Sequence, residues 1–392
     1  MKWDQQVGKA NNKQQILTII KNDAPISRAE IASKLGLTKG TVSSLINELL
    51  EAHLCYEIGP GESSGGRRPV MLLFNEHAGF TIGIDLGVNY ILGVLTNLNG
   101  EIIEEQKTWL KDVEFNHSVK LVKEMVHLLL QSAPNSPYGV IGIGIGVPGI
   151  VNKDGQILLA PNLGWKNISI KDELEKEFNL PIIVENEANA GAYAEKQFGA
   201  GKRYENLIYI SAGIGIGVGF ILHNELYRGS SGLAGEMGHM IVEENGTACS
   251  CGSRGCFELY ASEQALIKAA KLHLNSKKDL SLEDLIELAR TDKGIKNVFD
   301  TIGKYLGIGV NNIVNTFNPQ QIIIGNRLAM AKDLLYHPLR HFINNHTLTH
   351  SLEDLDISFS ELSIYSSALG VSAYVIDTFL ISTLFEELNE SK

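Results

Sequence analysis

Cysteine is scarce in this sequence. Only four occur among 392 residues, and three of them lie within eight positions of one another, as Cys249, Cys251 and Cys256. A disulfide-stabilised extracellular domain spreads its cysteines along the chain, so this clustering argues against that class of protein. We find no apolar run of membrane-spanning length, and the first residues lack the hydrophobic segment of a signal peptide. These absences predict a cytoplasmic protein with reduced thiols and no membrane partner.

Positive charge is also in short supply, with 34 Lys and Arg against 45 Asp and Glu and a net charge of −11. Residues 1–75 hold nine basic and seven acidic side chains, a balance of +2, whereas the remainder holds 25 and 38, a balance of −13. A polyanion is therefore expected to bind the first segment. The chain length predicts two or three domains.

The cysteine cluster is joined by one histidine within eighteen positions, which completes a set of one imidazole and three thiolates. The four candidate ligands are His239, Cys249, Cys251 and Cys256. This is the ligand set of a closed, tetrahedral zinc site, so the sequence predicts a structural Zn²⁺ ion. The alternative is that the cysteines are ordinary buried thiols and that the histidine is a hydrogen-bonded core residue.

Two carboxylates flank the same stretch. Glu236 precedes His239 by three residues and Glu258 follows Cys256 by two. A metal that gathers this segment would hold both carboxylates in fixed positions. Carboxylate oxygens accept hydrogen bonds, so such a pair suits a ligand rich in hydroxyl groups, such as a sugar. The alternative is that both are solvated surface acids.

The first fifty residues predict three short helices. An apolar stripe marks residues 13–21, Ser27 and Glu30 form a capping box for a second helix, and Thr38 caps a third helix after a turn at Gly36. Two helices joined by a short glycine-containing turn predict a helix-turn-helix. The residues that we expect to contact DNA there are Ser27, Thr38, Lys39, Thr41, Ser43, Ser44 and Asn47. The alternative is a three-helix dimerisation module with a solvated polar face.

A wing is predicted directly after these helices. Residues 55–58 and 70–74 resemble strands, and the glycine-rich segment between them contains Arg67 and Arg68. Paired arginines at the tip of a hairpin are suited to DNA phosphates or to the minor groove. The alternative is a flexible linker. Both interpretations place the end of a DNA-binding domain near residue 78.

From residue 79 strands and helices alternate, which predicts the α/β class. An Asp-x-Gly turn begins at Asp85, and a glycine-rich turn over 212–220 occupies the matching place in a second set of elements. This pairing predicts a two-lobed sugar kinase or actin-like fold behind an α+β winged helix-turn-helix. We expect a first lobe over 79–190 that is completed by 366–392. The second lobe, over 191–365, is expected to hold the zinc site and a dimer interface.

The motif Gly235-Glu236-x-Gly238-His239, followed by Cys249-x-Cys251-Gly252-x-x-Gly255-Cys256-x-Glu258, resembles the signature of the ROK family of repressors, open reading frames and kinases. The segments 185–189 and 162–165 are similar to its sugar-binding motifs, and the resemblance covers residues 78–380. The added head places the chain with the repressor branch. The sugar ligands that the resemblance implies are Gly149, Asn162, Asn186, Glu187, Glu236, His239 and Glu258. His239 would bind zinc through one ring nitrogen and the sugar through the other.

The chain departs from the family kinases at three places. Glu187 replaces their catalytic aspartate, Tyr90 ends a bulkier first phosphate turn, and Asn326 replaces the second glycine near the nucleotide base. Since misplacing a catalytic group by about 1 Å can cost on the order of 10²-fold in rate, we expect no enzyme activity. The alternative is a ROK-type ATP-dependent sugar kinase.

The resemblance implies a repressor that responds to a sugar. A homodimer, or a dimer of dimers, would bind a palindromic operator through its two heads. Xylose is the expected inducer that releases the operator, with glucose as a competitor for the same pocket.

Overall fold

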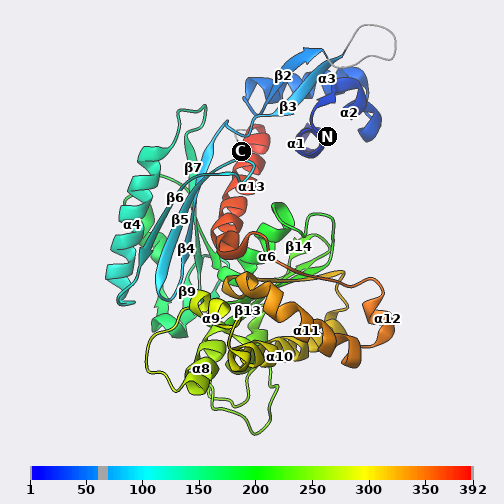
Figure 1. Ribbon diagram of the computed structural model, residues 1–392. Coiled ribbons are helices and arrows are strands. Elements are labelled where there is room, and N and C mark those ends of the chain that lie inside the picture. The colour runs from blue at the N-terminus through cyan, green and yellow to red at the C-terminus, as the bar shows by residue number, and fades with distance from the viewer. Residues whose placement is uncertain (1, 61–68, 390–392) are drawn as a thin grey trace.

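The computed structural model describes residues 2–60 and 69–389. It has a head at one end and a body of two lobes, and the last helix, red in Figure 1, runs from the body to the head. The head has the predicted winged helix-turn-helix arrangement. Its elements are α1 (Lys2–Asp23), β1 (Ile26–Ser27), α2 (Arg28–Leu35), α3 (Lys39–Glu51), β2 (Cys55–Pro60) and β3 (Val70–Phe74). The strands form one antiparallel sheet in the order β1-β3-β2.

Local hydrogen bonds begin and end the helices of the head. The N–H of Glu30 donates to Ser27 Oγ at 3.3 Å and the N–H of Ser27 donates to Glu30 Oε2 at 2.9 Å, which confirms the capping box. Thr38 Oγ1 accepts from the N–H of Thr41 at 3.1 Å at the start of α3. Gly36 has a φ of 65°, which ends α2 in the left-handed conformation that glycine favours. The prediction of a first helix over 13–21 is too short, because the apolar stripe that marks α1 begins only near its middle.

The first lobe is built on a five-stranded sheet in the order β11-β7-β4-β5-β6. Its strands are β4 (Phe80–Leu86), β5 (Tyr90–Asn97), β6 (Ile102–Trp109), β7 (Val140–Val147) and β11 (Ile182–Asn186). Helices α4 (Phe115–Ser132) and α5 (Ile170–Glu175) pack on this sheet and bury its apolar side chains. Between β7 and β11 the chain adds β8 (Ile150–Val151), β9 (Ile157–Ala160), the 3₁₀ helix η1 (Pro161–Leu163) and β10 (Trp165–Ile168).

The second lobe repeats this topology. Its sheet has the order β14-β13-β12-β15-β16. On one side of β12 the pairings with β13 and then β14 are antiparallel, and on the other side the pairings with β15 and then β16 are parallel. The strands are β12 (Leu207–Ala212), β13 (Ile216–Leu222), β14 (Glu225–Leu226), β15 (Gln321–Gly325) and β16 (Asp356–Phe359). The match between the two sheets confirms the predicted sugar kinase or actin-like fold.

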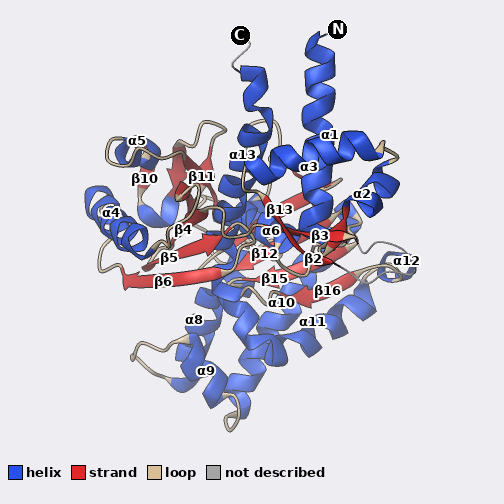
Figure 2. Cartoon of the chain, turned by 90° about the horizontal axis from the view of Figure 1, so that it is seen from above, coloured by secondary structure: helices blue, strands red, loops and turns tan. Residues whose placement is uncertain are grey.

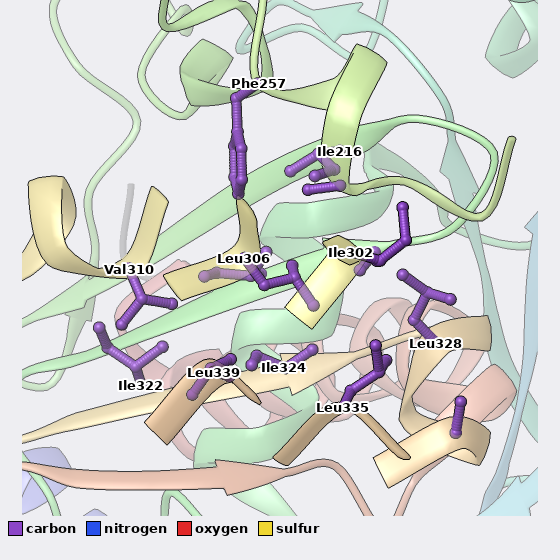
Figure 3. Close-up of a cluster of buried hydrophobic side chains, with 14 of the residues drawn as sticks. Ile216, Phe257, Ile302, Leu306, Val310, Ile322, Ile324, Leu328, Leu335 and Leu339 are labelled. Atoms are coloured by element: carbon purple, nitrogen blue, oxygen red, sulfur yellow. The ribbon is translucent and has the colours of Figure 1, made fainter. Parts of the chain in front are cut away.

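Helices cover the outer side of the second sheet. They are α8 (Glu263–Leu274), α9 (Leu282–Leu288), α10 (Lys293–Phe317) and α11 (Lys332–His346), and α12 (Thr349–Leu352) leads to the last strand. Leu306 of α10, Ile324 of β15 and Leu335 of α11 converge in this core, and the ring of Phe257 packs over them (Figure 3). A Cβ at Gly309 would lie 2.2 Å from that ring. The glycine thus makes room for Phe257, which anchors the cysteine segment next to it.

Two helices lie between the sheets, α6 (Glu187–Gln197) and α13 (Ser366–Asn389). A Cβ at Gly83 of β4 would lie 2.1 Å from the carbonyl oxygen of Ala368, so α13 approaches the first sheet closely. A Cβ at Gly219 of β13 would lie 2.3 Å from the carbonyl oxygen of Ala188, which brings α6 equally near the second sheet. Glycine in the strands therefore sets the spacing of both central helices.

The segment Ser363–Phe385, which includes most of α13, is long and apolar enough to cross a membrane by length and composition. The prediction that no apolar run reaches membrane-spanning length is therefore wrong. In the structure 56% of the apolar window is buried. Helix α13 packs on β4, β7 and α6, and its later residues share a core with α1 of the head. It is therefore a core helix that joins body and head, and Figure 2 shows its end and the start of α1 on the same side of the molecule.

Candidate functional site

The four predicted metal ligands come together. His239 ends the 3₁₀ helix η2 (Glu236–His239), and its ligand atoms and those of Cys249, Cys251 and Cys256 all lie within 4.8 Å of one another. Cys251 Sγ lies 3.7 Å from Cys256 Sγ, and Cys249 Sγ lies 3.7 Å from His239 Nδ1. A tetrahedron with Zn–S bonds of 2.3 Å has an S–S edge of about 3.8 Å, so the donor atoms fit a zinc ion.

Glycine gives this segment its shape. Gly252 and Gly255 have φ values of 93° and 70°, and a Cβ at Gly255 would lie only 1.6 Å from the carbonyl oxygen of Glu243. Cys249 and Cys256 are buried, whereas Cys251 is exposed. The fourth cysteine, Cys55, is buried in the core of the head, where burial raises the pKa of its thiol to about 12. The thiols that could hold a metal are thus confined to one loop of the second lobe.

The two flanking carboxylates take different positions around the imidazole. Glu236 Oε2 lies 3.9 Å from His239 Nε2, on the ring nitrogen that does not face a thiol. Glu258 begins α7 (Glu258–Ala261), and its Oε1 lies 3.5 Å from His239 Nδ1 and 3.4 Å from Cys249 Sγ. Burial raises the pKa of Glu236. Glu236 is therefore free to meet a ligand, whereas one oxygen of Glu258 is turned to the thiols.

A second group of predicted sugar ligands lies at the end of β11. Asn186 caps α6 by accepting from the N–H groups of Ala188 and Asn189 at 2.9 and 3.1 Å. Its side-chain NH₂ donates to the carbonyl oxygen of Gly149 at 2.8 Å, and Gly149 has a φ of 142°. One N–H of Asn186 remains for a ligand. Asn162 lies on η1 and is exposed.

Glu187 follows Asn186 and faces a buried acid of the first lobe. Tyr90 donates from its hydroxyl to Asp85 Oδ2 at 2.5 Å, and burial raises the pKa of Asp85 from 3.8 to about 6. Burial and the nearby Asp85 raise the pKa of Glu187 from 4.5 to about 8. A pKa near 8 favours the protonated form of Glu187 at neutral pH, and a protonated carboxyl is a poor general base.

This protonation predicts how stability varies with pH. The folded protein keeps the proton of Glu187 up to about pH 8, whereas the unfolded chain releases it near pH 4.5. The free energy of unfolding should therefore fall as the pH rises between these values, by at most about 1.4 kcal/mol per pH unit. Glu187→Gln should abolish this part of the slope, measured by denaturant unfolding without sugar. If Glu187→Gln leaves the pH dependence of the free energy of unfolding unchanged above the pKa of Asp85, Glu187 is ionised in the folded wild-type protein.

Side chains of the chain itself pack around the two turns at which the sequence departs from the family kinases. A Cβ at Gly87 would lie 2.6 Å from the ring of Tyr90, so this tyrosine covers the first glycine turn. In the second lobe, Asn326 donates to Ser211 Oγ at 3.0 Å and adopts a φ of 62°. The next residue, Arg327, begins the 3₁₀ helix η3 (Arg327–Ala331) and pairs with Glu263 at 3.2 Å and Glu283 at 2.9 Å.

The predicted DNA contacts lie mainly on the open face of α3. Of the predicted residues on this helix and its cap, Ser43 is half-buried and the others are exposed, namely Thr38, Lys39, Thr41, Ser44 and Asn47. Ser27 is a correction: it is 3% exposed and its hydroxyl donates to Glu30 Oε2 at 2.7 Å, so it serves as a cap. Arg67 and Arg68 lie outside the described residues.

The sequence did not reveal three arginines that pair with distant residues near the predicted DNA-binding and sugar-binding side chains. Arg28 donates to Asn47 Oδ1 at 3.2 Å and pairs with Glu57. Arg327 bridges two helices, and Arg228 pairs with Glu185 at 2.6 Å. Each partner lies many positions away in the sequence, so no local spacing marks these residues.

Comparison with known proteins identifies two regions. Residues 81–378 match the profile of the ROK family, and residues 10–54 match that of a winged helix-turn-helix DNA-binding domain. The chain is 46% identical over 375 residues to the xylose repressor of Bacillus subtilis (strain 168), a match that covers 95% of this chain and 97% of that protein.

Two solved structures resemble this chain, the first over 97% of it and the second over 76%. A ROK family transcriptional regulator, described as a homologue of the E. coli MLC protein, matches with a TM-score of 0.80 and 28% identity over 97% of this chain and 98% of that one. A ROK family glucokinase from Streptomyces griseus, in complex with glucose and AMPPNP, matches with a TM-score of 0.71 and 29% identity over 76% of this chain and 99% of that one.

Proposed function

Because the chain belongs to the ROK family and carries a winged helix-turn-helix head, we propose that it is a transcriptional repressor that xylose releases from DNA. One observation carries the proposal: this chain combines a helix-turn-helix head, whose α3 has an exposed polar face, with a ROK body. Its similarity to the xylose repressor of Bacillus subtilis (strain 168) covers 95% of this chain and therefore includes both parts. The polar residues along the open face of α3 suit contacts with bases and phosphates.

The sugar would be held by residues from both lobes, namely Gly149, Asn162, Asn186, Glu187, Glu236, His239 and Glu258. Two features support this set. Asn186 keeps one side-chain N–H after donating the other to the carbonyl oxygen of Gly149, and His239 turns Nε2 away from the thiols and toward Glu236. Xylose is the proposed inducer, and glucose would compete for the same site because it differs only by an additional CH₂OH arm.

The segment over residues 239–256, here called the metal loop, would hold a structural Zn²⁺ ion through His239, Cys249, Cys251 and Cys256. An ion there would fix Nδ1 of the imidazole and leave Nε2 for a sugar hydroxyl. It would also set the distance between the loop and Phe257, which is fully buried in the core of the second lobe. The metal is thus proposed to shape the sugar site without taking part in a reaction.

The repressor is proposed to act as a homodimer, or as a dimer of dimers, on a palindromic operator. Two identical heads related by a twofold axis match two half-sites related in the same way. Sugar would favour an arrangement of the lobes in which the spacing of the heads no longer fits the half-sites. Release is then a shift between two conformations.

The function is tested by DNA selection followed by sugar titration. Sequences that the protein retains from a random duplex library should contain an inverted repeat, and xylose should release them in a fluorescence anisotropy assay. Arabinose serves as a control for unspecific sugar effects. Retention of DNA at saturating xylose would contradict the proposal.

We expect no phosphorylation of xylose or glucose by ATP. The ring of Tyr90 lies against Gly87 in the first glycine turn. The raised pKa of Glu187, at the position of the kinases' catalytic aspartate, weakens it as a general base. A coupled ADP-release assay with either sugar should stay at the level of the protein-free blank. Sugar-dependent turnover above that blank would favour the alternative, a ROK-type sugar kinase.

A further inference from the structure

An ion pair joins the two lobes directly behind the proposed sugar ligands. Arg228 follows β14 in the second lobe, and its Nε and Nη2 donate to Glu185 Oε2 at 2.9 and 2.6 Å. Glu185 is the next-to-last residue of β11 in the first lobe and is only 6% exposed. Its other oxygen accepts from the N–H of Asn186 at 2.9 Å and from the side chain of Asn189 at 3.1 Å. The Glu185 carboxylate thus holds both the Asn186 backbone and Arg228. Arg228 in turn precedes Glu236 by eight residues in the sequence.

The other side of Arg228 faces an aromatic stack. Its guanidinium lies 5.5 Å from the ring centroid of Tyr374 on α13. Tyr374 stacks on Tyr193 of α6, with centroids 4.0 Å apart and planes 5° apart. The hydroxyl of Tyr193 donates to Asp377, one turn further along α13. The stack therefore connects the ion pair to the part of α13 that leaves the body, and Figure 1 shows this helix continuing to the head.

The same turns of α13 hold the head. Val375, Ile376 and Leu380 share a buried core with the apolar stripe of α1. Burial lowers the pKa of Lys21 in the last turn of α1, and the nearby Asp377 opposes this shift. The Lys21 ammonium lies 5.8 Å from the centroid of the Phe74 ring.

A second contact reaches the recognition helix itself. Tyr138, at the start of β7, donates from its hydroxyl to the carbonyl oxygen of Ala52 at 2.8 Å, and Ala52 caps the C-terminal end of α3. The ring of Tyr138 packs edge-on against Phe379 of α13, with centroids 4.8 Å apart. A shift of α13 would therefore change the packing of both α1 and α3.

We propose that Arg228 is a positioning residue that couples the sugar site to the DNA-binding head through Tyr374, Tyr193 and Asp377. The inference rests on the proposed function, since it names the path by which sugar releases DNA. A sugar that draws Asn186 and Glu236 together moves both ends of the Arg228–Glu185 pair. The planar guanidinium passes that movement to the ring beneath it, and α13 carries it to α1 as a rigid element.

Two substitutions cut the path at different points. Arg228→Lys keeps a positive charge beside Glu185 but loses the planar group over Tyr374, and Tyr193→Phe keeps the stack but loses the bond to Asp377. A matched control is a second trio of the same residue types, Arg203, Tyr204 and Asp356. There the guanidinium lies 4.7 Å from the tyrosine centroid, and the tyrosine hydroxyl donates to the carboxylate at 3.1 Å. Arg203→Lys and Tyr204→Phe therefore make the same chemical changes off the path.

The readout is the ratio of operator affinities without and with saturating xylose, measured on library-selected DNA with the full-length protein. Saturation removes any effect on xylose affinity, and the ratio cancels any change in basal DNA affinity. Arg228→Lys and Tyr193→Phe should each lower the ratio at least about fivefold. Both control variants should stay within about twofold of wild type, and the double variant should fall no further than the stronger single one, because both act on one path.

Each outcome decides a different statement. Wild-type ratios in both path variants would overturn the relay alone. If Arg203→Lys and Tyr204→Phe lower the affinity ratio as much as the path variants do, the loss is not specific to the path. That result would overturn the relay as well. If xylose fails to release the wild type, the proposed function falls and the relay falls with it. Xylose affinity of Tyr193→Phe by calorimetry should match wild type, since that residue bonds to no proposed sugar ligand.

Discussion

After extensive dialysis the purified protein is expected to retain close to one zinc ion per chain. Cys251→Ser should lower the zinc content and the thermal stability together. Structural zinc contributes about 10–16 kcal/mol of binding free energy in zinc-finger peptides, so even partial loss here should cost several kcal/mol. Cys251 is the exposed member of the four ligands, and serine replaces it without opening a cavity in the core. Loss of stability in this variant therefore reports on the metal and not on packing.

The control for zinc content is Cys55→Ala, which removes a thiol of the head and should leave the zinc content unchanged. Elemental analysis and a melting curve of each variant make the comparison. The physical reason to expect a linked loss is that the metal loop leads directly into Phe257, whose ring fills the space above Gly309 in the core. A metal-free protein with the wild-type melting temperature would contradict the zinc assignment.

Features that depend on nearby residues could be predicted from the sequence. The capping box at Ser27 and Glu30 forms because its atoms are three residues apart, and the structure has both of its hydrogen bonds. The gathering of His239 with the three cysteines could be predicted for a similar reason, since a loop of eighteen positions with glycine turns has few ways to arrange four ligands. The α/β class also followed from the alternation of strands and helices.

Features that depend on distant partners could not be predicted. Arg228 and Glu185 are 43 residues apart and Arg327 and Glu263 are 64 apart, so only the fold brings each pair together. The protonation of Glu187 has the same origin, because it is set by burial and by an aspartate of another strand. The apolar run of α13 was overlooked because its burial between two sheets leaves no alternation of polar and apolar residues to mark a face.

The two carboxylates beside the metal loop should respond differently to the same change. Glu236→Gln keeps the shape of the side chain and removes its charge, so a charge-assisted hydrogen bond to a sugar hydroxyl would lose about 1–2 kcal/mol. That corresponds to about tenfold in xylose affinity. Operator affinity without sugar should stay at the wild-type value, because the DNA contacts lie on the head. The variant would thus bind its operator and need about tenfold more xylose for half-release.

Glu258→Gln should show the same loss of xylose response and, in addition, weaker retention of zinc. The reason is that Glu258 Oε1 lies 3.4 Å from Cys249 Sγ and 3.5 Å from His239 Nδ1, where its charge acts on the metal ligands. Glu244→Gln is the matched control, since Glu244 is an exposed carboxylate of the same loop. Titration of xylose into a preformed operator complex, with zinc analysis of the same samples, separates the three variants. Normal release by both Glu236→Gln and Glu258→Gln would place the sugar elsewhere, because neither carboxylate could then be among its ligands.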